Sequence, residues 1–224
     1  MNATLLSLQI GTPAIHGTEG SSNPLTKPQL TAFYKKPVTG PVQILAETLE
    51  GDGVGNRKVH GGPDKAICAY PSEHYTHWQQ SLTLLAKEPF GAFGENFTTQ
   101  GLLETEVCVG DIFSLGTALL QISQPRQPCY TLARRWQLKN FPVLVDAAGF
   151  TGWYFRVLQT GVVHTGDTFT RQEQPLPQWT IARANNVMQE REPSLEALEE
   201  LAHCPLLADA WRRPLQQMLY QRKN

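Results

Sequence analysis

The stretch that decides the fold runs Ile112-Phe113-Ser114-Leu115-Gly116-Thr117-Ala118-Leu119-Leu120-Gln121-Ile122-Ser123. Two segments of strand length, both rich in apolar residues, flank the pair Gly116-Thr117. A two-residue loop with glycine first is typical of a type II′ hairpin turn, because glycine adopts the positive φ that this turn requires. The sequence therefore predicts antiparallel strands at 112–115 and 118–123.

Short strands are expected on both sides of this hairpin. The chain holds 16 prolines and 18 glycines, and they cut the first 180 residues into brief segments, a texture typical of a β-barrel or a sandwich. Further strands are predicted at 4–10, 42–47, 66–70, 96–99, 107–109, 151–158 and 168–172. One helix is predicted to begin at Ser72, with an apolar face formed by Tyr75, Trp78, Leu82 and Leu85.

The pattern changes to helices after residue 170. The prolines of Gln174-Pro175-Leu176-Pro177-Gln178 indicate an extended linker, because each proline disfavours helix in the residue before it. Helices are then predicted at 182–189, at 194–203 and from 206 to about 222, where Pro214 is expected to kink or divide the last one. We interpret the chain as a mainly β domain, a barrel with inserted helices over residues 1–175, and a small three-helix unit over residues 180–224.

Composition and charge limit the function. Apolar residues make up 41% and charged residues 17% of the chain, as expected for a packed globular protein. A formal charge of −1 argues against electrostatic binding of nucleic acid or of an anionic membrane surface. The first residues lack the basic region of a signal peptide, no segment has the length of a membrane span, and the four cysteines form no C-x-x-C pair. A cytoplasmic protein with free thiols is therefore expected.

A reactive thiol is predicted in Gln124-Pro125-Arg126-Gln127-Pro128-Cys129-Tyr130, which follows the hairpin directly. If Gln127 caps a helix and Pro128 takes its first position, Cys129 lies in the first turn beside free backbone N–H groups. The helix dipole and Arg126 then both favour the thiolate, the form that binds a soft metal or attacks an electrophile. A buried structural cysteine is the alternative, and it is the preferred interpretation for Cys68, Cys108 and Cys204.

Three other segments carry polar groups. The glycine-rich segment 50–65 brings Arg57, Lys58 and His60 to a backbone that could approach an anion, although a hairpin with solvated charges explains it as well. Glu95-Asn96 could hold the polar edge of a ring, or could simply form a turn. Glu73, His74 and His77 are interpreted as a solvated helix face rather than a metal site, because no further ligand is apparent.

Several of these blocks occur in the order found in one protein family. Lys58-Val59-His60-Gly61-Gly62-Pro63-Asp64-Lys65-Ala66, Phe93-Gly94-Glu95-Asn96-Phe97, Gly110-Asp111 and Gln124-Pro125-Arg126-Gln127-Pro128-Cys129 follow one another along the chain. Together they closely resemble MOSC domains, which are named for the C-terminal domain of molybdenum-cofactor sulfurase. The resemblance covers residues from about 40 to 170, and the helices after 180 are similar to the extension of the bacterial YiiM-like group.

The resemblance implies a fold, a cofactor and an activity. It implies a MOSC-type β-barrel that binds the molybdopterin form of the molybdenum cofactor, with Cys129 as the catalytic residue and the protein ligand to molybdenum. The implied activity is reduction of N-hydroxylated compounds, such as hydroxylaminopurine base analogues, in detoxification. Residues in the matching blocks become candidate cofactor-binding residues: Lys58, His60, Gly61, Gly62, Asp64, Glu95, Asn96 and Arg126.

The sequence leaves the partners and some alternatives open. It contains neither a dinucleotide-binding fingerprint nor a cluster motif, so a separate electron-donating reductase, based on flavin or an iron–sulfur centre, is expected. A homo-oligomer stays open. The alternative functions are a sulfur carrier with a persulfide on Cys129, a non-catalytic pterin- or purine-binding module, and a hydrolase that pairs Cys129 with His60 or His164.

Overall fold

The computed structural model describes residues 3–56, 60–82, 90–192 and 194–224. The strands are β1 (Ala3–Ile10), β2 (Ala14–His16), β3 (Gln29–Thr31), β4 (Lys36–Pro37), β5 (Val42–Ile44), β6 (Ile67–Pro71), β7 (Phe97–Gln100), β8 (Ile112–Leu115), β9 (Ala118–Pro125), β10 (Trp153–Gln159), β11 (Gly161–Val163) and β12 (Thr168–Glu173). The helices are α1 (Glu73–Ser81), α2 (Tyr130–Trp136), α3 (Phe141–Ala148), α4 (Ile181–Met188), α5 (Leu195–Ala202) and α6 (Asp209–Lys223), with a short 3₁₀ turn at Pro63–Lys65.

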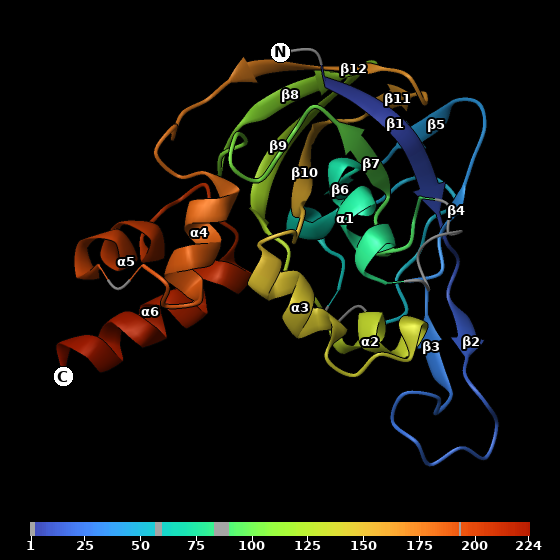
Figure 1. Cartoon of the computed structure of the whole chain (residues 1–224). Helices are drawn as coiled ribbons and strands as arrows, with labels where there is room; N and C mark the ends of the chain where they lie inside the picture. The colour runs from blue at the N-terminus through green and yellow to red at the C-terminus, as the bar shows by residue number, and fades with distance from the viewer. Residues whose placement is uncertain (1–2, 57–59, 83–89, 193) are drawn as a thin grey trace.

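A closed β-barrel forms the body of the molecule, as the sequence predicts. The strands follow the order β12-β8-β9-β10-β6-β7-β1, and the antiparallel pairing of β12 with β1 closes the ring. The pair β6 and β7 is parallel, whereas the other pairs in the ring are antiparallel. Figure 1 shows the barrel in the upper part of the view, with α4, α5 and α6 together on one side and the β2–β3 hairpin projecting from the other.

The predicted hairpin forms two neighbouring strands of the barrel, β8 and β9. Leu115 pairs with Ala118, which leaves Gly116 and Thr117 as the two-residue loop between β8 and β9. Gly116 has a φ of +55°, and a Cβ atom there would lie 2.2 Å from the carbonyl oxygen of Val162. Two separate reasons therefore require glycine at this position: the turn needs its positive φ, and the backbone at Val162 leaves no room for a side chain.

Aromatic side chains fill the inside of the barrel. Phe155 stacks on Phe169 with ring centroids 6.2 Å apart, and the ring of Phe113 meets both of them edge to face. These side chains come from β8, β10 and β12, and β10 and β12 are not neighbours in the ring, so they meet across the interior. The interior is a packed core, and a ligand must therefore bind outside it.

The three-helix unit shares its core with the barrel. Trp211 and Leu215 of α6 are buried in the same apolar cluster as the barrel side chains. Backbone hydrogen bonds also join the two parts: Val109 donates to Trp179, and Ile181 donates to Val107. The helices are thus packed onto the barrel rather than held by a linker alone.

Most predicted elements are confirmed, and three details differ. The strand predicted at 107–109 is absent, because these residues bond to the segment before α4 and form only an isolated bridge, Cys108 to Thr180. Pro214 does not divide α6, which continues through it while Trp211, Leu215 and Leu219 anchor one face. Helix α3 and the short strands β2, β3, β4 and β11 were not predicted. Leu85, predicted on the face of α1, lies outside the described residues.

A membrane-crossing helix can be assessed directly. Within the described residues, none of the helices combines the length and the hydropathy that crossing a bilayer requires.

The barrel interior yields the first testable prediction. Replacing Phe155 by Ala should lower the free energy of unfolding by about 3 to 5 kcal/mol, because it removes a fully buried ring and leaves a cavity. Leu158→Ala, on the same strand but 46% exposed, should cost about 1 kcal/mol or less. Urea unfolding followed by tryptophan fluorescence measures both, and equal losses for the two variants would contradict a packed interior.

Candidate functional site

A cavity of about 180 Å³ lies against the outer face of the barrel, where β6, β9 and β10 end beside several loops. Strand alternation explains which side chains face it. In β10, Trp153 and Phe155 are part of the core, so Tyr154 between them points outward. Tyr154 pairs in register with Cys68 of β6, and both side chains line the cavity.

A hydrogen-bond network fixes one wall of the cavity. The side-chain amide of Asn96 donates to Asp52 at 2.8 Å, and its oxygen accepts from the backbone N–H of Cys68 at 3.1 Å. Asp52 in turn accepts from the backbone of Gly11 at 2.7 Å and forms a buried ion pair with Lys35. Asn96 therefore links the loop at 52–56 to strand β6 of the barrel through hydrogen bonds. Asp52 also neutralises the charge of Lys35.

Arg126 brings a buried positive charge to the cavity. Its side chain is only 3% exposed, and Nη2 donates to the carbonyl oxygen of Phe93 at 2.6 Å. A further side-chain hydrogen bond joins it to Tyr154. Nη1 has no hydrogen-bond partner although it is buried. A buried guanidinium with an unused donor favours a negative charge beside it, so Arg126 makes this wall of the cavity suitable for an anion.

The thiol of Cys129 is the most perturbed nucleophile in the cavity. Burial alone would raise its pKa, but hydrogen bonds from His60 and Thr131 and the charge of Arg126 outweigh burial and lower the pKa to about 6. Burial raises the pKa of Cys68, in the same cavity, to about 11. At neutral pH Cys129 is therefore a thiolate and Cys68 a thiol, and Cys129 is the one prepared to bind a soft metal.

The position of Cys129 corrects one prediction. The residue is the N-cap of α2, with extended backbone (φ −102°, ψ 165°), and not a residue of the first helical turn after a Gln127 cap. Strand β9 continues to Pro125, and Arg126 still donates a backbone hydrogen bond to Gly152, so the chain needs residues 127–129 to leave the sheet. The thiolate owes its stability to side chains from three segments rather than to the start of a helix.

The structure brings most of the predicted site residues together. His60, Gly61, Asn96, Arg126 and Cys129 line the one cavity, although they come from segments up to about 70 residues apart. Gly62 does not line it, but its φ of +86° shapes the turn before Pro63. Lys58 lies outside the described residues.

Glu95 and Asp64 lie next to the cavity without lining it. Glu95 is buried and accepts hydrogen bonds from the Tyr75 hydroxyl and from the backbone of Gly91 and Phe93, so it fixes the loop that Arg126 contacts. The carboxylate of Asp64 pairs with Arg156 at 2.8 Å. Their geometry indicates support of the site rather than direct contact with a ligand.

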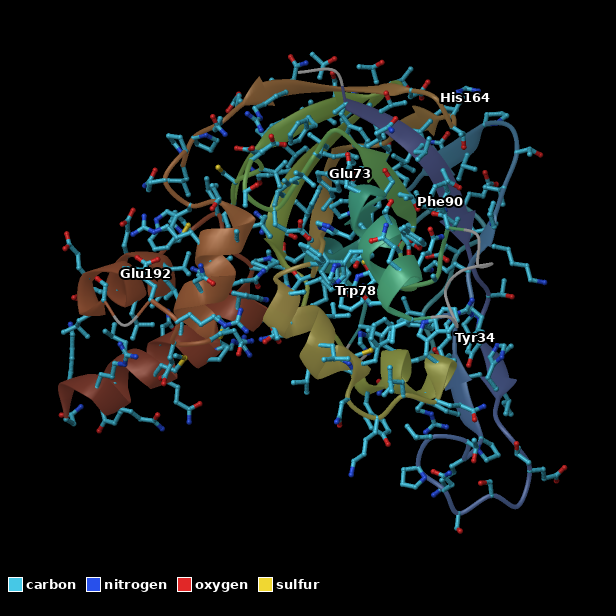
Figure 2. The ribbon with its side chains drawn as sticks, in the orientation of Figure 1. Tyr34, Glu73, Trp78, Phe90, His164 and Glu192 are labelled. Carbon is cyan, nitrogen blue, oxygen red and sulfur yellow. The ribbon has the colours of Figure 1, made fainter. Side chains whose placement is uncertain are left out.

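The structure bears on two alternatives, a pair of Cys129 with His164 and a metal site at Glu73, His74 and His77. His164 does not line the cavity, and Figure 2 shows it near the upper edge of the molecule, well above Tyr34, so of the two histidines only His60 is placed to pair with Cys129. The solvated face predicted for Glu73, His74 and His77 is wrong for His74, which is buried and hydrogen-bonded to Glu104 at 2.7 Å. Glu73 and His77 are exposed, and Glu73 accepts a hydrogen bond from the backbone N–H of Gly101. Among the described residues, no group of three or more His, Cys, Asp or Glu side chains is arranged to hold a metal ion.

Several lining residues carried no signal in the sequence. Lys35 and Tyr154 lie in segments without a motif, and Asp52 lies in the glycine-rich segment 50–65 but was not itself predicted to belong to the site. Only the closed barrel brings the three residues together. Tyr154 lies in a strand that the sequence predicts, but nothing in the sequence of that strand indicates a site. Burial raises its pKa, so the phenol remains protonated and can act as a hydrogen-bond donor in the cavity.

The fold and this site define a class of protein. The MOSC domain profile matches residues 56–170, and a profile described as "YiiM-like, 3-alpha helix domain" matches residues 179–222. The chain therefore belongs to the MOSC family and carries the C-terminal helical unit of its YiiM-like members.

Individual relatives agree with this assignment. The chain is 38% identical to the uncharacterized protein YflK of Bacillus subtilis over 212 residues, which cover 93% of this chain and 91% of YflK. The crystal structure of YiiM from Geobacillus stearothermophilus matches with a TM-score of 0.78 and 36% identity, covering 97% of this chain and 99% of that one. A protein of Gibberella moniliformis named "Reductase" is 35% identical over 181 residues, 79% of this chain but 32% of that larger protein.

The thiolate can be tested without any cofactor. The rate of Cys129 alkylation by iodoacetamide should rise with pH around a midpoint near 6, far below the usual pKa of a free cysteine. His60→Ala should move this midpoint upward, because it removes a hydrogen bond to the sulfur. Cys129→Ser gives the background from the other cysteines, and a wild-type midpoint above pH 8 would refute the proposed electrostatics.

Proposed function

We propose that this protein is a molybdenum-cofactor-dependent reductase of N-hydroxylated compounds, with hydroxylaminopurine-type base analogues as substrates and detoxification as its role. The observation that carries the proposal is the pairing of a stabilised thiolate, Cys129, with the buried and incompletely bonded guanidinium of Arg126 in one cavity. Membership of the MOSC family, whose domain is associated with molybdenum-cofactor binding, and a relative named as a reductase support it.

The residues fit such a cofactor. Molybdenum accepts thiolate ligands, and Cys129 offers one thiolate with no competing set of protein ligands among the described residues. The organic part of the cofactor carries a phosphate, and Arg126 and Lys65 bring positive charge to the cavity walls. Asp52 is the one carboxylate among the described lining residues, and Lys35 balances it.

The chain would position reactants and exclude water, while the cofactor would supply the two electrons and the affinity for oxygen that cleave an N–O bond. In the overall reaction an N-hydroxyl group, two electrons and two protons give an N–H group and water. His60 holds the sulfur of Cys129 through a hydrogen bond and keeps it from rotating away. The protonated phenol of Tyr154, bound to Arg126, is a donor within the same wall and can orient an oxygen atom of a ligand.

Electrons must come from elsewhere under this proposal. The sequence has no dinucleotide-binding fingerprint, so a separate flavin or iron–sulfur reductase is the proposed donor. Turnover of the purified, cofactor-loaded chain with NADPH as sole reductant would contradict that part of the proposal and leave the cofactor assignment intact.

The ligand assignment predicts the metal content of two cysteine variants. Protein produced in cells that make the molybdenum cofactor should contain close to one molybdenum per chain, and Cys129→Ala should lose the metal and the N-hydroxyl reductase activity. Cys68→Ala is the matched control, because Cys68 lines the same cavity but is protonated at neutral pH. Elemental analysis measures both, and full occupancy in Cys129→Ala would refute the assignment.

The same preparations separate the competing functions. Protein from cells unable to make the cofactor provides the baseline. A labile sulfane sulfur on Cys129 without molybdenum would favour the sulfur carrier, and a chain that binds a pterin or purine with neither would favour the binding module.

Arg126 gives an independent prediction. Arg126→Ala should reduce cofactor retention at least about tenfold, because the lost charge-assisted hydrogen bonds are worth about 1.5 to 3 kcal/mol. Arg183→Ala is the control, since Arg183 is paired with Glu192 in the C-terminal helical unit and does not line the cavity. Pterin fluorescence after oxidation reports cofactor content, and equal retention in the two variants would show that Arg126 does not contact the cofactor.

A further inference from the structure

A second cavity, of about 160 Å³, adjoins the first one. It lies between the β2–β3 hairpin and helix α2, which Figure 1 shows beside each other at the lower edge of the molecule. Its wall is formed by His16, Gly17, Thr18, Leu25, Thr26, Gln29, Thr31, Tyr34, Thr131, Arg134, Arg135 and Gln137. Gln29, Thr31 and Thr131 line both cavities, so the two cavities share a wall.

Thr131 connects the second cavity to the reactive sulfur. Its side chain hydrogen-bonds the sulfur of Cys129 and also forms part of the wall of the second cavity. A single side chain therefore separates the thiolate from this space. A molecule whose reacting end lies near Cys129 can extend past Thr131 without leaving the protein surface.

The charge of the second cavity is positive. Arg134 and Arg135 both contribute to its wall, and the described wall residues include no carboxylate. Within the described part of the chain, the side chain of Arg134 makes no hydrogen bond or ion pair. A guanidinium presents its N–H groups in a planar fork that matches two oxygens of a phosphate.

Aromatic rings hold the second arginine in place. The guanidinium of Arg135 lies 4.6 Å from the ring centre of Tyr34 and 5.0 Å from that of Trp136. The ring of Tyr34 also stacks on His16, with centroids 3.8 Å apart and planes inclined by 9°. Figure 2 places Tyr34 beside the hairpin, facing α2. This packing reduces the conformational freedom that Arg135 would lose on binding an anion.

We propose that the second cavity is a phosphate subsite, and that the substrates of this enzyme include nucleoside 5′-monophosphates whose base carries the N-hydroxyl group. The inference rests on the proposed reductase function, which puts the base near Cys129. The ribose then passes Thr131, and the phosphate meets Arg134 and Arg135. Under the proposed function the cofactor phosphate would meet Arg126 and Lys65 in the first cavity, so the positively charged wall of the second cavity would serve the substrate.

Equilibrium binding tests the subsite without turnover. Isothermal titration calorimetry on the cofactor-loaded protein should show adenosine 5′-monophosphate, an unreactive analogue, binding at least about tenfold more tightly than adenosine. Arg134→Gln should remove this preference by weakening the nucleotide alone, and added salt should weaken it in the wild type. Lys139→Gln is the matched control: it removes one positive charge a few residues away from an exposed position that does not line the cavity.

The outcomes distinguish the subsite from its alternatives. Equal binding of nucleotide and nucleoside by the wild type would overturn the proposal, as would equal losses for both ligands in Arg134→Gln. A fall in pterin content in Arg134→Gln, with nucleotide preference unchanged, would assign the arginines to the cofactor phosphate instead. With the N-hydroxylated nucleotide as substrate, KM should rise about tenfold in Arg134→Gln while kcat is retained.

The failure of the inference and that of the reductase function can be told apart. A chain that carries molybdenum and reduces N-hydroxylated bases but does not prefer the phosphorylated ligand refutes only the subsite. A chain without molybdenum that still prefers adenosine 5′-monophosphate, and loses the preference in Arg134→Gln, refutes only the reductase function.

Discussion

The site depends on one electrostatic constraint, a guanidinium that stays charged while almost fully buried. Burial by itself would lower the pKa of Arg126, but Cys68, Tyr154 and Cys129 around it more than offset this and raise the pKa above its usual value. Of these three acids, Cys129 is the one that is ionised at neutral pH, since the pKa values of the other two are raised. The thiolate and the guanidinium therefore stabilise each other, and removing either one leaves the other buried charge less well compensated.

The barrel is what makes this pair rigid. Arg126 follows the last residue of β9 and donates its backbone N–H to Gly152 just before β10. Gly152 has a φ of +70°, and a Cβ atom there would lie 2.2 Å from the carbonyl oxygen of Ala69 in β6. Three strands thus converge within contact distance where the charge is placed. A side chain at residue 152 would separate them and move Arg126 away from Cys129.

The sequence is informative about this fold where the pattern is local. The β8–β9 hairpin follows from its glycine and its apolar flanks, and the C-terminal helices follow from their spacing and from the Ser194 cap, whose hydroxyl accepts from Ala197. The strands β2 and β3 have three residues each, which is too short to show the alternation of apolar and polar residues that marks a strand. Helix α3 contains a proline and two valines, and the packing of Phe141 and Val145 against the aromatic cluster stabilises it more than its own propensity does.

The same distinction applies to the site. His60, Asn96, Arg126 and Cys129 could be found because each lies in a recognisable block of sequence. Lys35, Tyr154 and Arg134 could not, because their relevance comes only from the loops, strands and helix that the closed barrel brings together. The Cys129 cap was misplaced for a related reason. The backbone hydrogen bond between Arg126 and Gly152 keeps the chain in the sheet longer than the two prolines suggest.

The positive charge is therefore divided between the two cavities: Arg126 lines the first, and Arg134 and Arg135 line the second. Arg126 is inside, nearly inaccessible to water, where its field on Cys129 is strong and little screened. Arg134 and Arg135 are partly exposed on α2, where charge attracts an anion from solution but perturbs the sulfur less. Thr131 lines both cavities and hydrogen-bonds the sulfur of Cys129. A ligand with a neutral ring and a charged tail suits this arrangement, since its ring can lie beside the thiolate while its anionic group stays away from that negative charge.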